Sequence, residues 1–314
     1  MKQNNNKAHN TNWRLIIGAI VSVLAVFFVY LQRETIKKSI EALGEANWVY
    51  VFSAIAVYSC TVLAAAALIY QLRLVEKIRY SSILIVQTST LFLGRITPAS
   101  VGGLAAMGRV LFTQGHTAVQ SGTVVAAGGV ATFTGNVLLT TVALLLSLNS
   151  VKLNTLQLPT FMVYIIIGII TVSIILLFIK KVRLKILTML KEVLTTLKNY
   201  EHKKASVALA VLYGAIVTLC FALTMMLAAK SLGINLSLFA AIITVSLGSL
   251  GVAVTPLPGG VVGAEAALAA TMVQFGVPGD VALAIAFVYR FVIFWLPLLP
   301  GYIASQYALK KQLL

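Results

Sequence analysis

Four charged side chains lie inside apolar stretches of the sequence, and they are the strongest candidates for chemistry. They are Arg95, Arg109, Glu265 and Arg290. A charge near the centre of a bilayer costs about 2.5–3.5 kcal/mol on insertion scales, so such residues usually face a partner, water or a ligand. Three guanidinium groups against one carboxylate leave a net positive interior, and arginine binds phosphate through two parallel hydrogen bonds. The set therefore favours a phosphate-bearing ligand over a polyvalent cation.

Each of these charges also has a purely structural interpretation. Glu265 and Arg290 can form an ion pair that only holds helices together. Arg109 can extend its side chain to the membrane surface instead of lining a cavity. For Arg95, which directly precedes a Gly/Pro-rich break, we expect such snorkelling or the capping of backbone carbonyls.

The composition assigns the chain to a membrane. Its 314 residues are 60% hydrophobic and 10% charged, and the mean hydropathy is +0.97. Soluble domains carry about 25% charged residues. The net charge of +16 would suggest nucleic acid in a soluble protein, but here the basic residues lie between apolar runs, where they orient the chain in the bilayer. We therefore exclude nucleic acid as a partner.

Apolar runs of about 20 residues are long enough to cross the hydrocarbon core. Two further apolar stretches, 81–113 and 236–277, are broken by Gly and Pro at 94–103 and 255–260, and an unbroken helix cannot pass through such sequences. We expect these two stretches to be re-entrant helical hairpins. The sequence thus predicts an all-α, polytopic membrane protein with six full spans, at 13–31, 49–70, 118–148, 161–179, 206–229 and 280–306.

The distribution of basic residues predicts the orientation of these spans. With the N-terminus inside, the inner segments hold 16 Lys and Arg residues and the outer segments hold 5. This bias agrees with the positive-inside rule and places both termini in the cytoplasm. We expect one transmembrane domain at 13–306, a basic amphipathic connector at 180–204, and polar tails at 1–12 and 307–314.

The two broken stretches belong to an internal repeat. A shift of 158 residues places Thr97-Pro98 on Thr255-Pro256 and Gly102 on Gly260, and it carries repeat one (about 49–148) onto repeat two (about 206–306). The predicted topology gives these units opposite orientations. Inverted repeats with breaks at matching positions point to a transport site near the midplane. The candidate site residues at the breaks are Thr97, Gly102, Gly103, Thr255, Gly259 and Gly260.

We find no sequence pattern typical of an enzyme or a metal site. The histidines His9, His116 and His202 are widely separated, and Cys60 and Cys220 lie within apolar runs with no metal-ligand spacing. We therefore predict no catalytic residues and no cofactor. His116 and Asp280 lie at segment ends, where we expect both to be solvated.

The second half resembles the membrane region of bacterial lysylphosphatidylglycerol synthases and their flippase-like relatives. The resemblance is carried by TPLPGGVVGAEAAL (255–268) and by AIAFVYRFVIFWLPLLPG (284–301), which contains Tyr289-Arg290. In the first half the chain departs from the family pattern at Leu104, where Gln or Glu is usual, and at 128–133, where an acidic-basic element is common. The resemblance implies movement of a charged lipid between leaflets, such as an aminoacylated phosphatidylglycerol or a polyprenyl-linked sugar. Because the chain ends at Leu314, we do not expect it to carry the family's aminoacyltransferase domain.

The sequence thus predicts a lipid flippase-like transporter of the cytoplasmic membrane, with membrane lipids as partners and homo-oligomerisation left open. In this hypothesis the two breaks meet, Arg109 and Arg290 contact a head-group phosphate, and Glu265 orients Arg290 or receives a head-group amine. Tyr289 completes the predicted substrate site. Two alternatives are a secondary transporter for a small organic anion and a non-catalytic membrane subunit of a lipid-modifying system.

Overall fold

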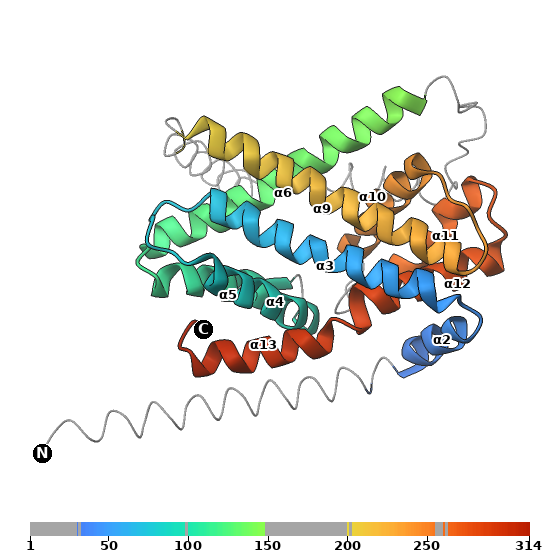
Figure 1. The fold of residues 1–314 in the computed structure, drawn as a ribbon, viewed down its shortest axis with the longest axis horizontal. Helices are drawn as coiled ribbons and strands as arrows, with labels where there is room; N and C mark the ends of the chain where they lie inside the picture. Colours follow the sequence, from blue (N-terminus) through green and yellow to red (C-terminus); the bar gives the residue numbers. More distant parts are fainter. Residues whose placement is uncertain are drawn as a thin grey trace, which may run out of the picture.

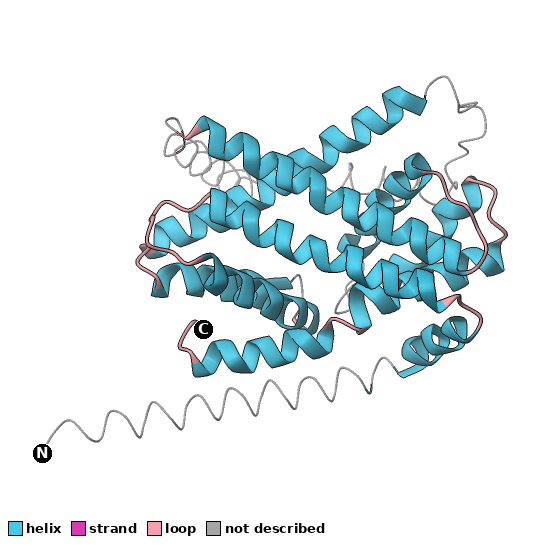
Figure 2. Cartoon of the chain, in the orientation of Figure 1, coloured by secondary structure: helices cyan, strands magenta, loops and turns pink. Residues whose placement is uncertain are grey.

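Every regular element in the described part of the chain is a helix (Figure 2). The computed structural model describes residues 30, 33–97, 100–147, 200, 203–254, 260 and 263–314. The predicted spans 13–31 and 161–179, the tail 1–12 and most of the connector 180–204 lie outside these residues.

Among the described residues, four helical stretches are long and apolar enough to cross a bilayer, and each coincides with a predicted span. They are α3 (Trp48–Gln71), α6 (Ala118–Ser147), α9 (Lys204–Ser231) and the stretch Gly279–Lys310. Many of their large apolar side chains are exposed, including Val119 at 80% and Phe133 at 68%. Exposed apolar surface on this scale fits a lipid environment rather than water. The last helix extends to Lys310, past the predicted end at 306.

Both Gly/Pro-broken stretches form pairs of short helices that pack against each other. The first pair is α4 (Tyr80–Ile96) and α5 (Val101–Thr113), and the second is α10 (Leu238–Val254) and α11 (Gly263–Gln274). Helices α4 and α10 end 158 residues apart, which is the repeat shift predicted from the sequence. The predicted breaks are therefore confirmed.

Helices α3 and α9, which are equivalent in the repeat, lie side by side and run in opposite directions (Figure 1). At one end the backbone N–H of Asn47 donates to the carbonyl of Ser231 at 2.8 Å. At the other end the Lys203 Nζ donates to the carbonyl of Arg73 at 3.3 Å. The start of each helix thus lies beside the end of the other, as an inverted repeat requires.

The last predicted span is interrupted in its middle, which the sequence analysis did not anticipate. It consists of α12 (Gly279–Arg290), a π-helical turn η4 (Phe291–Trp295) and α13 (Leu298–Lys310). Pro297 has no N–H, so it cannot donate to the carbonyl four residues earlier, which belongs to Ile293. The interruption therefore leaves a backbone acceptor free inside the helix bundle.

A further helix, α2 (Arg33–Gly44), precedes α3, between the predicted spans 13–31 and 49–70. Its ion pairs Arg33–Glu34 and Lys37–Glu41 are both 3.9 Å long and exposed. Pairs of this kind contribute little to stability. Helix α2 packs on α12 and also contacts the π-helical turn η4 at the centre of the last span.

Candidate functional site

Glu265 and Arg290 form a buried ion pair in the second half. The Arg290 Nε donates to the Glu265 Oε1 at 2.8 Å, and each side chain is only 4% exposed. Glu265 lies in the first turn of α11 and Arg290 is the last residue of α12, so the pair joins two packed helices. The structure thus brings together two of the predicted site residues, and the carboxylate balances the charge of the guanidinium.

Arg95, at the end of α4, connects the first half to the interrupted span of the second. Its Nη1 donates to the Leu91 carbonyl of its own helix, which confirms the expected backbone capping. Its Nη2 donates to the Tyr58 hydroxyl at 2.9 Å and also to the Ile293 carbonyl. That carbonyl is the acceptor left free by Pro297. Arg95 therefore satisfies a polar group that the proline had removed from the helical hydrogen-bond ladder.

Phe294 lies between the two arginines. Its ring centroid is 4.1 Å from the Arg290 guanidinium carbon and 5.3 Å from that of Arg95. Both distances are within the range of cation–π attraction, which is strongest where water is excluded. Arg95, Phe294, Arg290 and Glu265 therefore form one connected group, named here the junction cluster, with two positive charges and one negative charge.

A cavity of about 380 Å³ opens beside Arg95 between α3, α4, α5 and α6. We call it the first-half cavity. Its polar lining residues are Gln87, Thr90, Arg95, Ser100 and Thr132. Leu104 and the Gly128–Gly129 pair line it as well, so both departures from the family pattern lie on this cavity. A second, mostly apolar cavity of about 360 Å³ lies on the other side of α4 and is lined by Tyr58 and Pro297.

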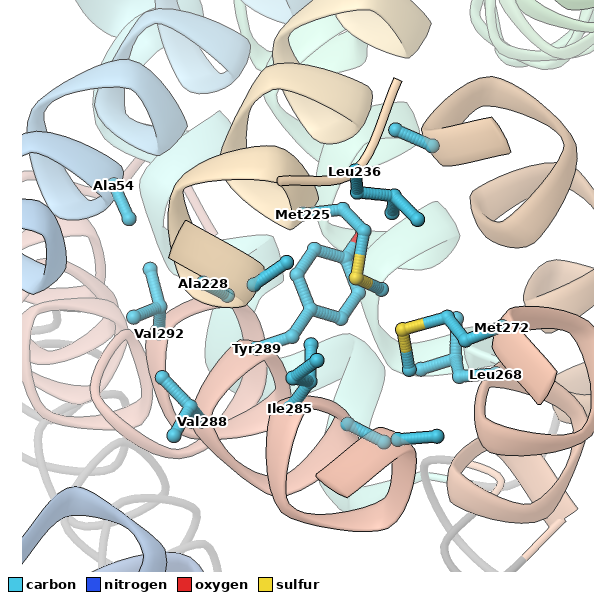
Figure 3. Close-up of a cluster of buried hydrophobic side chains, with 14 of the residues drawn as sticks. Ala54, Met225, Ala228, Leu236, Leu268, Met272, Ile285, Val288, Tyr289 and Val292 are labelled. Carbon is cyan, nitrogen blue, oxygen red and sulfur yellow. The ribbon is translucent and has the colours of Figure 1, made fainter. Parts of the chain in front are cut away.

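Two predicted site residues lie away from the junction cluster. The Arg109 side chain is exposed on α5, with its guanidinium carbon 5.9 Å from the ring centroid of Phe112 on the same helix. The structure therefore does not bring Arg109 to Arg290. Tyr289 is 2% exposed and lies in the apolar core, where Figure 3 places its ring between Met225 and Ile285. Neighbouring helix residues point about 100° apart, so Tyr289 faces the core while Arg290 faces Glu265.

The predicted residues at the first break build the α4–α5 turn. The Thr97 Oγ1 donates to the Leu93 carbonyl at 2.7 Å and accepts from the backbone N–H of Gly102 at 2.9 Å. A Cβ at Gly102 would lie 2.6 Å from the Leu93 carbonyl oxygen, and one at Gly103 would lie 3.3 Å from the Gly94 Cα. These residues therefore permit a tight hairpin.

At the second break, Gly260 has a φ of +61°, and a Cβ there would lie 2.5 Å from the Val252 Cα. This backbone conformation strongly favours glycine. The predicted site residues Thr255 and Gly259 lie outside the described residues. In the described part of the chain, the two hairpins pack mainly on the long helices, and the junction cluster connects them.

The partners of Arg95 were not predicted from the sequence. Tyr58 and Phe294 look like ordinary apolar positions in the sequence, but Pro297 within an apolar span was a readable signal of a free carbonyl. The expectation for His116 was wrong. His116 is 3% exposed, and its Nε2 accepts from the backbone N–H groups of Leu74 at 3.1 Å and Val75 at 3.3 Å. Asp280 is exposed, as expected.

Comparison with known proteins agrees with this architecture. The family described as "Lysylphosphatidylglycerol synthase TM region" matches residues 15–301, which is nearly the whole chain. No curated protein matches the sequence. The matched region is the membrane part of that family. The chain therefore belongs to the family of lysylphosphatidylglycerol synthase transmembrane regions and is a multi-pass membrane protein.

Proposed function

We propose that the protein is a flippase-like transporter that moves a phosphate-bearing lipid between the leaflets of the cytoplasmic membrane. In this proposal α4–α5 and α10–α11 are re-entrant hairpins, the two repeats have opposite orientations, and both termini face the cytoplasm. Family membership and the antiparallel packing of α3 on α9 support the arrangement.

The junction cluster is the observation that carries the proposal. It places Glu265, Arg290 and Arg95 within apolar helices and connects the first hairpin to the second through the interrupted last span. Intramembrane ionisable residues at the contact between two repeats are typical of transport pathways. The buried Oε2 of Glu265 has no hydrogen-bond partner among the described residues, which is a costly arrangement for a group with no role beyond packing.

The π-turn supports movement at this point. A π-helical turn and a proline weaken the backbone ladder, and such interruptions are frequent at functional sites in helices. The contact from Arg95 to the Ile293 carbonyl is a single side-chain contact, and it can exchange for another acceptor without unfolding either helix. A ligand that competes for Arg95 would therefore loosen the connection between the two halves.

The test is a leaflet-exposure assay on the full chain in vesicles of phosphatidylcholine and phosphatidylglycerol. Removing one member of the ion pair leaves a buried unpaired charge, so single variants lose stability as well as function. The informative variant is therefore the double substitution Glu265→Gln with Arg290→Met, which removes both charges at similar size. We expect it to insert and remain folded while losing most lipid translocation.

Three outcomes would contradict the proposal. Wild-type lipid movement in the double variant would make the ion pair a structural element only. Absence of lipid movement in the wild type, together with uptake of a small organic anion, would favour the solute transporter. Absence of both activities would favour a membrane subunit of a lipid-modifying system.

A further inference from the structure

The junction cluster contains one positive charge that no described residue neutralises. Arg290 is paired with Glu265, whereas none of the carboxylates in the described part of the chain forms a salt bridge with Arg95. The protein acceptors of Arg95 are neutral oxygens of Leu91, Tyr58 and Ile293. They engage the Nη1 and Nη2 groups and leave the Nε–H and one Nη1–H of its five donors for a ligand.

The repeat shows why a cavity exists beside Arg95. The shift of 158 residues places Glu265 on Met107 and Arg290 on Thr132. Both Met107 and Thr132 line the first-half cavity. The second half thus fills this position with an ion pair, whereas the first half carries smaller or uncharged side chains there and leaves a space of about 380 Å³. A space of this size lies within the range of small-molecule sites, about 300–1,000 Å³.

The lining of the cavity defines the chemistry of its ligand. Arg95 is the one charged residue among the described residues that line it. Gln87, Thr90, Ser100 and Thr132 supply neutral donors and acceptors, and apolar side chains of α3 and α5 line the remainder. An arginine with free donors recognises a phosphate, and neutral polar groups recognise hydroxyls. A protonated amine would find no carboxylate in this lining and would meet the charge of Arg95.

We propose that the first-half cavity binds the phosphodiester of an anionic lipid whose head group is otherwise uncharged, with Arg95 as the phosphate ligand. This inference rests on the proposed function and specifies its substrate class. It assigns Arg95 the role in phosphate recognition that the sequence analysis gave to Arg109. The Glu265–Arg290 pair lies in the opposite half and keeps the role in translocation that is proposed above.

Binding is tested separately from translocation. The purified full chain in detergent is titrated with phosphatidylglycerol, with aminoacylated phosphatidylglycerol and with phosphatidylcholine, and bound lipid is measured by native mass spectrometry. We expect phosphatidylglycerol to bind about tenfold or more tightly than the aminoacylated lipid, which corresponds to one charge-assisted hydrogen bond. Glycerol 1-phosphate serves as the soluble competitor, and we expect only weak competition because it cannot use the apolar part of the cavity.

The glycines of α6 provide a matched pair of variants. Gly129 lines the cavity, and a Cβ there meets nothing within 4 Å, so Gly129→Leu fills the space without a backbone clash. Gly122 lies on the same helix, a Cβ there is equally free, and it does not line the cavity. We expect Gly129→Leu and Arg95→Gln to weaken phosphatidylglycerol binding about tenfold or more, and Gly122→Leu to bind as the wild type does.

Several results would overturn the inference. They are unchanged binding by Gly129→Leu, equal or tighter binding of the aminoacylated lipid, or displacement of the lipid by glycerol 1-phosphate at similar concentrations. A protein that binds phosphatidylglycerol in this cavity but moves no lipid would refute the proposed function and leave the site standing. A protein that moves lipid but does not bind it here would refute the site alone.

Discussion

The two halves of the molecule share one architecture but treat charge in opposite ways. In the second half, Glu265 and Arg290 neutralise each other at full burial. In the first half, the equivalent positions are Met107 and Thr132, and the nearby Arg95 is partly buried beside a cavity. A buried ion pair fixes the geometry of its helices, whereas an unneutralised arginine requires an anion or water. The comparison therefore separates a rigid half from a half that can exchange ligands.

The largest expected effect tests this separation directly. Arg290→Met leaves the Glu265 carboxylate buried without a counter-charge, and we expect a loss of about 3–5 kcal/mol in the free energy of unfolding. Arg95→Met leaves the Ile293 carbonyl without its donor, and we expect a loss of about 1–3 kcal/mol. Unfolding by sodium dodecyl sulfate, followed by circular dichroism, measures both values.

The double variant Glu265→Gln with Arg290→Met is the control for this experiment. It removes both charges and should recover most of the stability lost in Arg290→Met. If Arg95→Met lowered the free energy of unfolding more than Arg290→Met does, the first half would be the rigid one and the second half the one that can exchange ligands.

A smaller effect concerns the ionisable side chain of His116, which lies in the connection between α5 and α6. Burial lowers the pKa of His116, and the charge of Lys203 lowers it further, while a contact with the Leu111 backbone opposes both. Lys203 and Arg73 face this region from the neighbouring segments. The neutral Nε2 accepts from Leu74 and Val75, and protonation would turn this acceptor into a donor.

The direction of the pH dependence follows from the lowered pKa. The folded state binds this proton less readily than the unfolded state, so the stabilisation is complete above the unfolded value of about 6.5. The stabilisation decreases as the pH falls below that value, and it stops decreasing once the pH is below the pKa of the folded state. We expect a loss of about 2 kcal/mol, since two hydrogen bonds are at stake. Thermal unfolding from pH 8 to pH 5 measures the slope.

His116→Gln is the matched variant, because its amide oxygen can accept from the same backbone groups without titrating in this range. His9 and His202 remain in both proteins, so the difference between the two pH profiles reports on His116. Parallel profiles would show that protonation of His116 does not act on the fold.

The arrangement of the helices was largely predictable because its determinants are local. Apolar run length defines the spans, and Pro and Gly mark the breaks at α4–α5 and α10–α11. The Glu265–Arg290 pair was foreseen as an alternative to a ligand site, since an acid and a base in neighbouring apolar helices have few other partners.

The site itself was less predictable because it depends on contacts distant in sequence. Arg95 and Ile293 are 198 residues apart, and their contact uses a carbonyl to which Pro297 cannot donate. The sequence also does not define which face of α5 is covered, so Arg109 was placed inside although its side chain is exposed. The first-half cavity is lined by residues of four helices, among them Gly128, Gly129 and Thr132, and no single residue reveals it.

The smallest expected effect makes the first half resemble the second. Leu104 lines the first-half cavity and is 54% exposed, so Leu104→Glu adds a carboxylate without opening a hole in the core. The new carboxylate would partly neutralise Arg95 and would favour a head-group amine. Because position 104 is this exposed, we expect the new carboxylate to change the binding free energy of each lipid by about 1 kcal/mol, or about a fivefold change in affinity.

Leu104→Glu should change the affinities for two lipids in opposite directions. Phosphatidylglycerol should bind more weakly to Leu104→Glu than to the wild type, and aminoacylated phosphatidylglycerol should bind more tightly. Ala105 is exposed on the same helix and does not line the cavity, so Ala105→Glu controls for added negative charge on α5. If both glutamate variants changed binding equally, the charge would act through the whole surface. If only Leu104→Glu reversed the preference between the two lipids, the head-group selectivity would lie in the first-half cavity. The second repeat fills the equivalent space with the Glu265–Arg290 ion pair.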